Sequence, residues 1–202
     1  MNDIELNIKE HYDEDVSVLD RLNTHFIFNA LNSIKCTAMS DPDETCRLIN
    51  DIGAYMRYRI QTIKYCKCVP CSEEIRYLKS YINLEKSRYP GIEVKYEIND
   101  SDFTLPAMSV IFLSENAIRH GFNKPNKEGN LLISSWRTSK YHVLQICDDG
   151  IGFSKEYVTR SNEFGTLGYI KDNIENMCGG NINIESICGQ GTSVEVRIPF
   201  MK

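Results

Sequence analysis

The amino-acid sequence predicts an α+β protein in which an N-terminal helical hairpin is followed by an α/β two-layer sandwich. The hairpin is indicated by apolar residues that recur with the period of an α-helix in two consecutive segments joined by a turn motif. The sandwich is indicated by short alternating segments, typical of strands, that are interleaved with helical segments in the second half of the chain. We place the domain boundary after residue 71, which gives domains of residues 1–71 and 72–202.

The composition restricts the classes of partner. The chain has 202 residues, 42% of them hydrophobic, which suffices for one full domain and a smaller element. Its net charge of −5 argues against nucleic acid, because nucleic-acid binding depends mainly on Lys and Arg neutralising phosphates. No apolar run reaches the roughly 18 residues of a membrane span, and residues 1–10 lack the pattern of a signal peptide. We therefore expect a cytoplasmic protein without a direct membrane span.

The eight cysteines are scattered through the predicted helices and strands, so reduced thiols are expected in a cytoplasmic protein. Cys66, Cys68 and Cys71 have a spacing that could begin a zinc site. However, no nearby His or Cys supplies the fourth ligand that such sites usually have. Zinc is therefore the less favoured interpretation of these residues.

The first helix is expected over residues 15–39, and its two faces differ in character at about 100° per residue. The apolar face comprises Ile27, Leu31, Ile34 and Ala38. The opposite face comprises His25, Asn29, Asn32 and Cys36. His25 is thus predicted to point away from the core, which fits poorly with a buried structural histidine. A plain solvated surface histidine is the alternative.

Residues 40–44 are predicted to end this helix and to start the next. Asp41 can cap, Pro42 suits the first helical turn, and Glu44 completes a capping-box spacing. The second helix then runs to about residue 63, and its apolar stripe consists of Ile49, Ile52, Met56, Ile60 and Ile63. Two helices cannot bury such long stripes alone, so a partner hairpin is expected to complete a four-helix bundle. This predicts a homodimer.

Residues 64–71 are interpreted as a linker to a third helix. That helix is expected to have Ser72 as its N-cap, Glu73 and Glu74 in its first turn, and its end at residues 89–91.

The remaining elements follow from alternation, helical period and turn residues. A strand is expected over residues 92–98, and a helix is expected to begin at Pro106. Further strands are expected at residues 130–136, 141–147, 181–187 and 193–199, with a helix at 167–177 and a mobile polar lid at 154–163.

The loop after the strand at residues 141–147 has features of a ligand site. Asp148 is followed by Gly150 and Gly152, and glycine lets a backbone pass close to a ligand without a Cβ clash. The loop could therefore hold a nucleotide, although turns that only need positive φ use the same residues.

A second polar group is expected on the helix after Pro106. Asn116 shares a helix face with Arg119 and His120, three and four residues later. An amide oxygen and two potential cations suit a Mg²⁺-bound triphosphate, and a plain polar helix surface is the alternative.

The second half of the chain, residues 92–199, resembles the ATP-binding domain shared by sensor histidine kinases, type II topoisomerases, Hsp-type chaperones and mismatch-repair ATPases. ENAIRHG at residues 115–121 is similar to the N box, DDGIG at 148–152 to the first glycine box, and GQGT at 189–192 to the third. The resemblance implies ATP and Mg²⁺ as ligands. It implies that Asn116 holds Mg²⁺, that Asp148 hydrogen-bonds the adenine amino group and that Thr192 supports this contact. The other nucleotide-binding residues would be Arg119, His120, Gly150, Gly152, Gly165, Gly168 and Gly191.

The first half contains LNTHFIFNALNSI at residues 22–34, which is similar to the phosphoacceptor box of the sensor kinases typified by LytS and YehU. This resemblance implies that His25 receives a phosphoryl group and that Asn29, one turn later, orients its imidazole. A neutral imidazole has a lone pair with which to attack, and its unperturbed pKa of about 6.5 keeps much of it neutral.

Three positions depart from the family pattern. Thr24 stands where the family has Pro, and Ile111 stands where many members have Gln. The second glycine box normally reads Gly-x-Gly-Leu, whereas this chain has Gly165-Thr166-Leu167-Gly168. A bulky Leu167 where backbone should approach phosphate could weaken ATP binding.

The resemblance implies a cytoplasmic ATP-dependent histidine kinase that acts as a homodimer and passes its phosphoryl group to the receiver domain of a response regulator. Its input could come from a separate sensor protein, a small ligand or a further domain. The first alternative is a histidine phosphotransfer or docking protein with a degenerate ATP-binding domain. The second is an ATPase, but Phe112 stands where such enzymes have a general-base Glu and cannot activate water.

Overall fold

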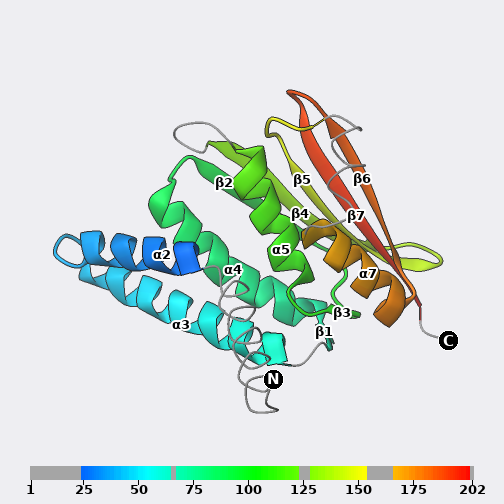
Figure 1. The fold of residues 1–202 in the computed structure, drawn as a ribbon, viewed down its shortest axis with the longest axis horizontal. Helices are drawn as coiled ribbons and strands as arrows, with labels where there is room; N and C mark the ends of the chain where they lie inside the picture. The colour runs from blue at the N-terminus through cyan, green and yellow to red at the C-terminus, as the bar shows by residue number, and fades with distance from the viewer. Residues whose placement is uncertain (1–23, 65–66, 123–127, 154–165, 201–202) are drawn as a thin grey trace, which may run out of the picture. The chain divides into compact units, whose positions relative to one another are not determined.

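The computed structural model describes residues 24–64, 67–122, 128–153 and 166–200. The chain divides into two compact units, residues 1–65 and 66–202. Figure 1 shows the helices of the first unit in blue and cyan, and the elements of the second unit from cyan-green to red. The contacts group residues 66–71 with the second unit. The domain boundary after residue 71 stays a prediction.

The first unit is a helical hairpin of α2 (Thr24–Thr37) and α3 (Pro42–Lys64), as the sequence predicts. The Glu44 backbone N–H donates a hydrogen bond to Asp41 Oδ1 at 2.8 Å, which confirms the predicted cap. The Thr45 hydroxyl also donates to the Asp41 carbonyl oxygen at 2.8 Å. The part of the first predicted helix before Thr24 lies outside the described residues.

The buried face of the hairpin differs from the predicted one. Phe26 and Ala30 are the buried residues of α2, and the Phe26 ring lies 4.9 Å from the Tyr55 ring of α3. In the predicted apolar stripes, by contrast, Leu31 is 49% exposed and Ile49 is 51% exposed. A single hairpin therefore does not bury these stripes fully, as the sequence analysis expects. The aromatic pair, which offers more apolar area, packs between the helices instead.

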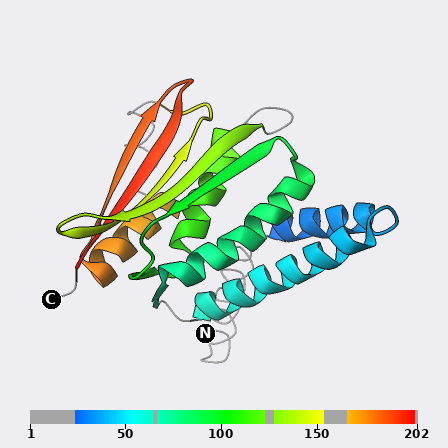
Figure 2. The same ribbon diagram turned by 180° about the vertical axis from the view of Figure 1, so that it is seen from behind.

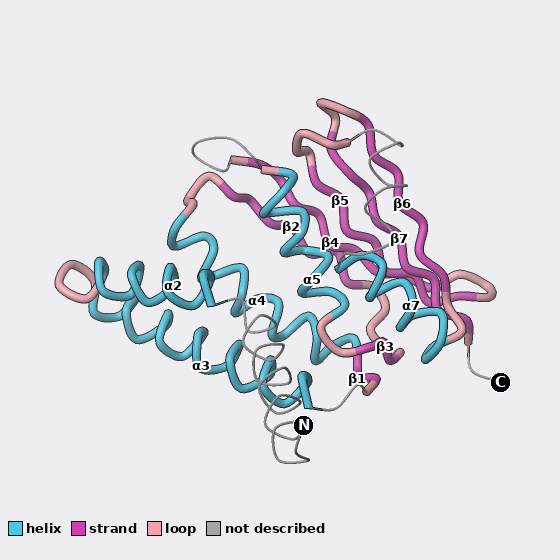
Figure 3. Tube along the Cα trace, viewed as in Figure 1, coloured by secondary structure: helices cyan, strands magenta, loops and turns pink. Residues whose placement is uncertain are grey.

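The second unit is an α/β two-layer sandwich. Helices α4 (Cys71–Arg88), α5 (Ser109–Asn116) and α7 (Thr166–Cys178) cover one face of its sheet, as Figure 3 shows. In the described chain the strand order is β2 (Ile92–Ile98), β4 (Gly129–Arg137), β5 (Tyr141–Asp148), β7 (Gly191–Pro199) and β6 (Asn181–Ile187). β2 runs parallel to β4, and the other neighbours are antiparallel. Figure 2 shows the same sheet from behind.

The predicted strands of this sheet are confirmed, with small differences at their ends. The helix expected at residues 167–177 is also confirmed as α7. Between the layers lies an aliphatic core, whose most deeply buried side chains include Leu78, Leu84, Ile92, Leu105, Ile111, Leu113 and Ile118. Burial of this apolar surface holds the helices on the sheet.

Residues 68–70, predicted as part of a linker, form a short strand instead. β1 (Cys68–Pro70) pairs antiparallel with β3 (Thr104–Pro106), which places Val69 opposite Leu105. The N-cap of α4 is consequently Pro70, and the predicted N-cap Ser72 lies inside the helix. Pro106 ends β3 and does not begin a helix. A three-residue strand was missed because its partner lies far along the chain.

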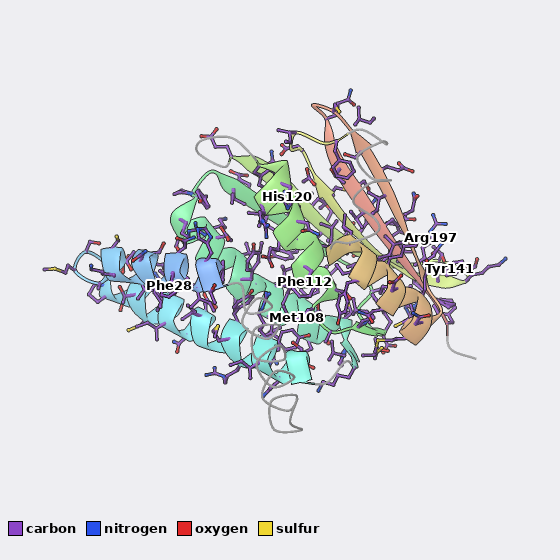
Figure 4. All side chains as sticks on the ribbon, in the orientation of Figure 1. Phe28, Met108, Phe112, His120, Tyr141 and Arg197 are labelled. Carbon is purple, nitrogen blue, oxygen red and sulfur yellow. The ribbon has the colours of Figure 1, made fainter. Side chains whose placement is uncertain are left out.

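Helix α5 begins at Ser109 because a side chain of α4 caps it. Met108, labelled in Figure 4, precedes the helix with a left-handed φ of 70°. The fully buried Glu74 carboxylate accepts hydrogen bonds from the backbone N–H groups of Met108 at 2.7 Å and Val110 at 2.9 Å. Its negative charge therefore lies at the positive end of α5. The predicted role of Glu74 in the first turn of its own helix was thus incomplete.

The lid expected at residues 154–163 lies outside the described residues. Among the helices that the structure describes, none has the length and apolar character that crossing a membrane requires.

Candidate functional site

His25 lies in the first turn of α2 and is exposed, as the sequence predicts. The side-chain amide nitrogen of Asn29, one turn later, lies 3.1 Å from His25 Nδ1 and 3.2 Å from Nε2. A neutral imidazole has one N–H and one lone pair, so this amide can donate to only one ring nitrogen at a time. The structure therefore brings together the two residues predicted to act in phosphoryl acceptance.

The orientation of the Asn29 amide decides what it does for His25. An amide N–H that donates to the ring occupies the lone pair needed for attack. With the amide turned by half a rotation, its oxygen accepts the ring N–H and leaves the lone pair on the other nitrogen available. Phe28, labelled in Figure 4, is 68% exposed on the same helix, so the surroundings of His25 are partly apolar.

Asp148 is the last residue of β5 and is half-buried. Its Oδ1 accepts a hydrogen bond from the Gly150 backbone N–H at 3.0 Å. Burial raises the pKa of the Asp148 carboxyl to about 6; the N–H groups of Gly150 and Thr192 oppose this rise, and the Asp149 carboxylate adds to it. A desolvated carboxylate of this kind is a strong acceptor for a ligand N–H group.

The neighbouring Asp149 has a structural role. Its Oδ1 accepts the Asn130 backbone N–H at 2.7 Å, and its Oδ2 accepts the Asn130 side-chain amide at 2.6 Å. This carboxylate fixes the end of β5 to the start of β4. Only Asp148 of the pair is thus available to a ligand.

Three glycine-containing segments meet beside Asp148. A Cβ on Gly150 would lie 2.4 Å from the main chain of Gly121, and a Cβ on Gly191 would lie 1.9 Å from the Asp148 carbonyl oxygen. Gly191 and Gly152 also have left-handed φ values of 98° and 58°. These glycines permit the close backbone contact between segments that the sequence places far apart.

Backbone hydrogen bonds hold the same three segments together. The Ile151 N–H donates to the Gly121 carbonyl oxygen at 2.9 Å, and the Gly189 N–H donates to the Ile151 carbonyl oxygen at 2.7 Å. The structure thus brings ENAIRHG, DDGIG and GQGT together, and their use as one nucleotide site stays a prediction. Part of the glycine content serves this packing, which was the structural alternative for the motif.

Thr192 contributes through its backbone and its side chain. Its N–H donates to the Asp148 carboxylate, and its hydroxyl lies 2.9 Å from Ser186 Oγ. Ser186 Oγ also accepts the Phe153 N–H at 2.9 Å. Sequence reasoning missed Ser186, although it stands opposite Thr192 across the hairpin of β6 and β7. It also missed Gly121, whose signal was a glycine at the end of a helical motif.

Asn116, Arg119 and His120 do not lie on one regular α-helix. Asn116 is the half-buried last residue of α5, and the five residues that follow form the π-helix η1 (Ala117–Gly121). The expected common face assumed an α-helical pitch, which η1 does not keep. Arg119 and His120, the latter labelled in Figure 4, are both exposed. The wide turn carries Gly121 against Asp148.

The second glycine box is described only in part. Gly165 lies outside the described residues, whereas Leu167 and Gly168 are half-buried in the first turn of α7. The N–H groups at the start of this helix are suited to a phosphate.

The donor groups fit Mg²⁺-ATP better than a protein-held metal. Among the described residues, no group of three His, Cys, Asp or Glu side chains could hold a metal ion. The Asn116 amide oxygen is a ligand that Mg²⁺ accepts, with its other positions filled by water and phosphate oxygens. The zinc interpretation has no such cluster in support, and Cys66 lies outside the described residues.

Comparison with known proteins identifies two matching family models. Residues 17–92 match the "Histidine kinase" model, and residues 109–202 match the "Histidine kinase-, DNA gyrase B-, and HSP90-like ATPase" model.

Curated relatives include sensor protein LytS of Bacillus subtilis, 24% identical over 100% of this chain and 36% of that protein. LytS of Streptococcus mutans is 28% identical over 90% of this chain and 33% of that protein. Sensor histidine kinase BtsS of Escherichia coli is 26% identical over 89% of this chain and 32% of that protein. The chain thus spans about a third of the length of these relatives.

Solved structures with a similar fold include the catalytic domain of histidine kinase ThkA, with a TM-score of 0.54, 20% identity, and coverage of 67% of this chain and 96% of that chain. ThkA in complex with response regulator protein TrrA has a TM-score of 0.54 and 18% identity, covering 95% of this chain and 66% of that chain. The histidine kinase domain of the blue-light activated kinase from Erythrobacter litoralis has a TM-score of 0.52 and 18% identity, covering 95% and 93%.

Proposed function

Because the chain belongs to the sensor histidine kinases of the LytS/YehU type, we propose that it phosphorylates His25 from Mg²⁺-ATP and passes the phosphoryl group to a response regulator. The acceptor in the regulator would be an aspartate of its receiver domain. ThkA, whose fold is similar, forms a complex with such a regulator. A cytoplasmic location and input from a separate sensor protein belong to the same proposal.

The observation that carries this proposal is the exposed His25 with Asn29 at its ring nitrogens. The Asn29 amide oxygen would accept a hydrogen bond from the ring N–H. This contact would hold one tautomer of His25 and leave the lone pair of the other ring nitrogen facing solvent. That lone pair would form the new N–P bond while the bond from the γ-phosphorus to the bridging oxygen breaks and ADP leaves, and the histidine would then release its ring proton to solvent.

The second unit would bind the nucleotide. ATP supplies the phosphoryl group, and Mg²⁺ neutralises the charge on the phosphates. Asp148 would accept a hydrogen bond from the adenine amino group while Thr192 holds the carboxylate in place, and the Asn116 amide oxygen would be a ligand of the ion. The other residues proposed to bind the nucleotide are Arg119, His120, Gly150, Gly152, Gly165, Gly168 and Gly191.

Exposed aliphatic residues on the hairpin favour action as a homodimer. Leu31, Ile49 and Ile60 are 49%, 51% and 46% exposed. A second hairpin placed on them would complete the proposed four-helix bundle and remove this apolar surface from water.

The test is incubation with ATP labelled at the γ-phosphate, followed by acid treatment, which removes phosphate from histidine. We expect acid-labile label in the wild-type protein, none in His25→Ala, and normal label in Lys35→Ala, an exposed residue of the same helix outside the phosphoacceptor box. Label that persists in His25→Ala would contradict the proposal.

A phosphotransfer or docking protein is the second candidate, favoured by Leu167 in the first turn of α7. In that case His25 would exchange phosphate with a phosphorylated regulator without using ATP. Calorimetry with a non-hydrolysable ATP analogue and Mg²⁺ separates the two, since only the kinase requires binding. Phe112, which is half-buried, offers no general base for an ATPase.

A further inference from the structure

Two cysteines that are far apart in the sequence meet in the second unit. Cys68 lies in β1, Cys178 is the last residue of α7, and their Sγ atoms are 3.5 Å apart. Both thiols are half-buried. Neither belongs to the nucleotide site or to the hairpin, so the proposed function does not use them.

The other strand of this region, β3, lies beside both cysteines. β1 pairs with β3, and Cys178 Sγ lies 4.0 Å from the carbonyl oxygen of Thr104 in β3. A disulfide requires an S–S distance of about 2.05 Å, so the sulfurs need to approach by only about 1.5 Å. Side-chain rotation is suited to so short a movement, and the backbones of β1 and α7 can keep their positions.

A metal site is the competing use for paired thiols. The described residues around this pair include no third ligand that could complete such a site. Cys71, the neighbouring cysteine in the chain, is fully buried at the start of α4. The pair is therefore better suited to redox chemistry than to metal binding.

We propose that Cys68 and Cys178 are a reversible dithiol site that reacts with low-molecular-weight disulfides such as oxidised glutathione. The Cys68 thiolate attacks one sulfur of the reagent, and the first glutathione leaves. The Cys178 thiolate then attacks the Cys68 sulfur and displaces the second glutathione. Two protein thiols are oxidised, one glutathione disulfide is reduced, and the two thiol protons pass to the two glutathiones.

The order of attack follows from the environment of Cys178. Burial, together with the adjacent Cys68 sulfur, raises the pKa of its thiol to about 12. Cys178 is therefore a poor first nucleophile. Once Cys68 carries glutathione, its sulfur can no longer become a thiolate. The contribution of Cys68 to the raised pKa of Cys178 is then lost, and only the effect of burial remains.

The bond has a defined structural effect. It joins the strand that opens the second unit to the far end of α7, whose first turn carries the second glycine box. The loop that it closes spans most of the second unit, so the unfolded chain loses conformational freedom and the folded unit gains stability. The redox state would thereby determine how firmly β1 is held.

The test uses the folded protein in a Cys188→Ser background, because Cys178 and Cys188 lie on the same tryptic peptide. Cleavage after Lys67 separates Cys66 from Cys68, and fragmentation of the linked peptide distinguishes Cys68 from Cys71. After treatment with oxidised glutathione we expect a Cys68–Cys178 linked peptide and a rise in Tm of about 5–15 °C. A reductant should reverse both changes.

Cys68→Ser and Cys178→Ser should each lose the linked peptide and the rise in Tm, whereas Cys36→Ser, an exposed residue of the hairpin, should keep both. Persistent glutathione adducts without the linkage would overturn the proposal, as would a linkage that forms only in denaturant or leaves Tm unchanged.

Discussion

The Asn29 amide can either block or assist His25, depending on which of its atoms meets the imidazole. Its nitrogen lies 3.1 Å and 3.2 Å from the two ring nitrogens, so the amide is close enough for both arrangements. Assistance requires the amide oxygen to accept the ring N–H. A residue at this position therefore controls the tautomer of the phosphoacceptor.

We predict that Asn29→Ala lowers the rate of His25 labelling by roughly 10- to 100-fold, because the imidazole loses its orientation. Asn29→Asp should also be slower at neutral pH, because a carboxylate beside the ring stabilises the imidazolium form, which has no lone pair with which to attack. Its rate should recover at higher pH, whereas that of Asn29→Ala should not. Identical pH profiles for the two variants would contradict this role.

Asp148 is held in an environment that opposes its charge. Its pKa of about 6 in the folded protein exceeds the unfolded value of about 3.9. Between these two values the folded protein binds a proton that the unfolded chain does not, so stability from this group is present at low pH and falls as pH rises through 6. The ionised carboxylate costs on the order of 3 kcal/mol at neutral pH.

We predict that Asp148→Asn is more stable than the wild-type protein at pH 7, by about 1–2 kcal/mol, and that this advantage disappears near pH 4. Urea unfolding at the two pH values measures the effect. The same variant should bind ATP weakly, and wild-type affinity should fall as pH drops through 6 because the protonated carboxyl accepts poorly. Asp149→Asn provides the contrast, since it weakens the contact with Asn130 and should destabilise the protein at pH 7.

At the scale of the elements, the start of α5 depends on a side chain from another helix. Glu74 is fully buried on α4 and accepts the N–H groups of Met108 and Val110. Met108 takes a left-handed conformation, unusual for a residue with a side chain, and the cap offsets this strain. The position of the N-box asparagine therefore depends on the packing of α4 against α5.

Glu74→Ala is expected to destabilise the second unit by about 3 kcal/mol or more, because two buried N–H groups lose a charged acceptor. Glu73→Ala, at the adjacent half-exposed position, should change stability by less than about 0.5 kcal/mol. Chemical unfolding of the two variants compares them. Equal stabilities would show that the cap is dispensable.

At the scale of the whole molecule, the hairpin leaves more aliphatic surface in solvent than a single copy would favour. The aromatic contact of Phe26 with Tyr55 lies inside the hairpin, whereas Leu31, Ile49 and Ile60 of the predicted stripes are exposed. This arrangement gives the two sets of apolar residues different roles, with the first holding the hairpin and the second available to a partner copy.

We predict that Leu31→Glu combined with Ile49→Glu converts a dimer into a folded monomer, because a charge on each stripe opposes burial. Sedimentation measures the mass, and circular dichroism should show unchanged helix content. Ile187→Glu, at a 59% exposed position on β6, is the matched control and should remain dimeric. A double variant that still sediments as a dimer would place the interface elsewhere.

The sequence by itself predicted the two layers of the fold and the order of most elements, because period and turn chemistry are local properties. The turn at Asp41 and the strands that carry Asp148 and Thr192 are examples. Recognition of the phosphoacceptor and glycine motifs also needed only the order of residues. These features can be read from short segments without knowing which other segments they contact.

Which residues meet depends on tertiary packing. The pairing of β1 with β3, the cap on α5 from Glu74 and the meeting of Cys68 with Cys178 each join segments far apart in sequence. The π-helical turn that presses Gly121 against Asp148 also arises from packing and not from helical preference. Such contacts depend on close packing between segments that are distant in sequence, and a local sequence pattern does not reveal which segments pack together.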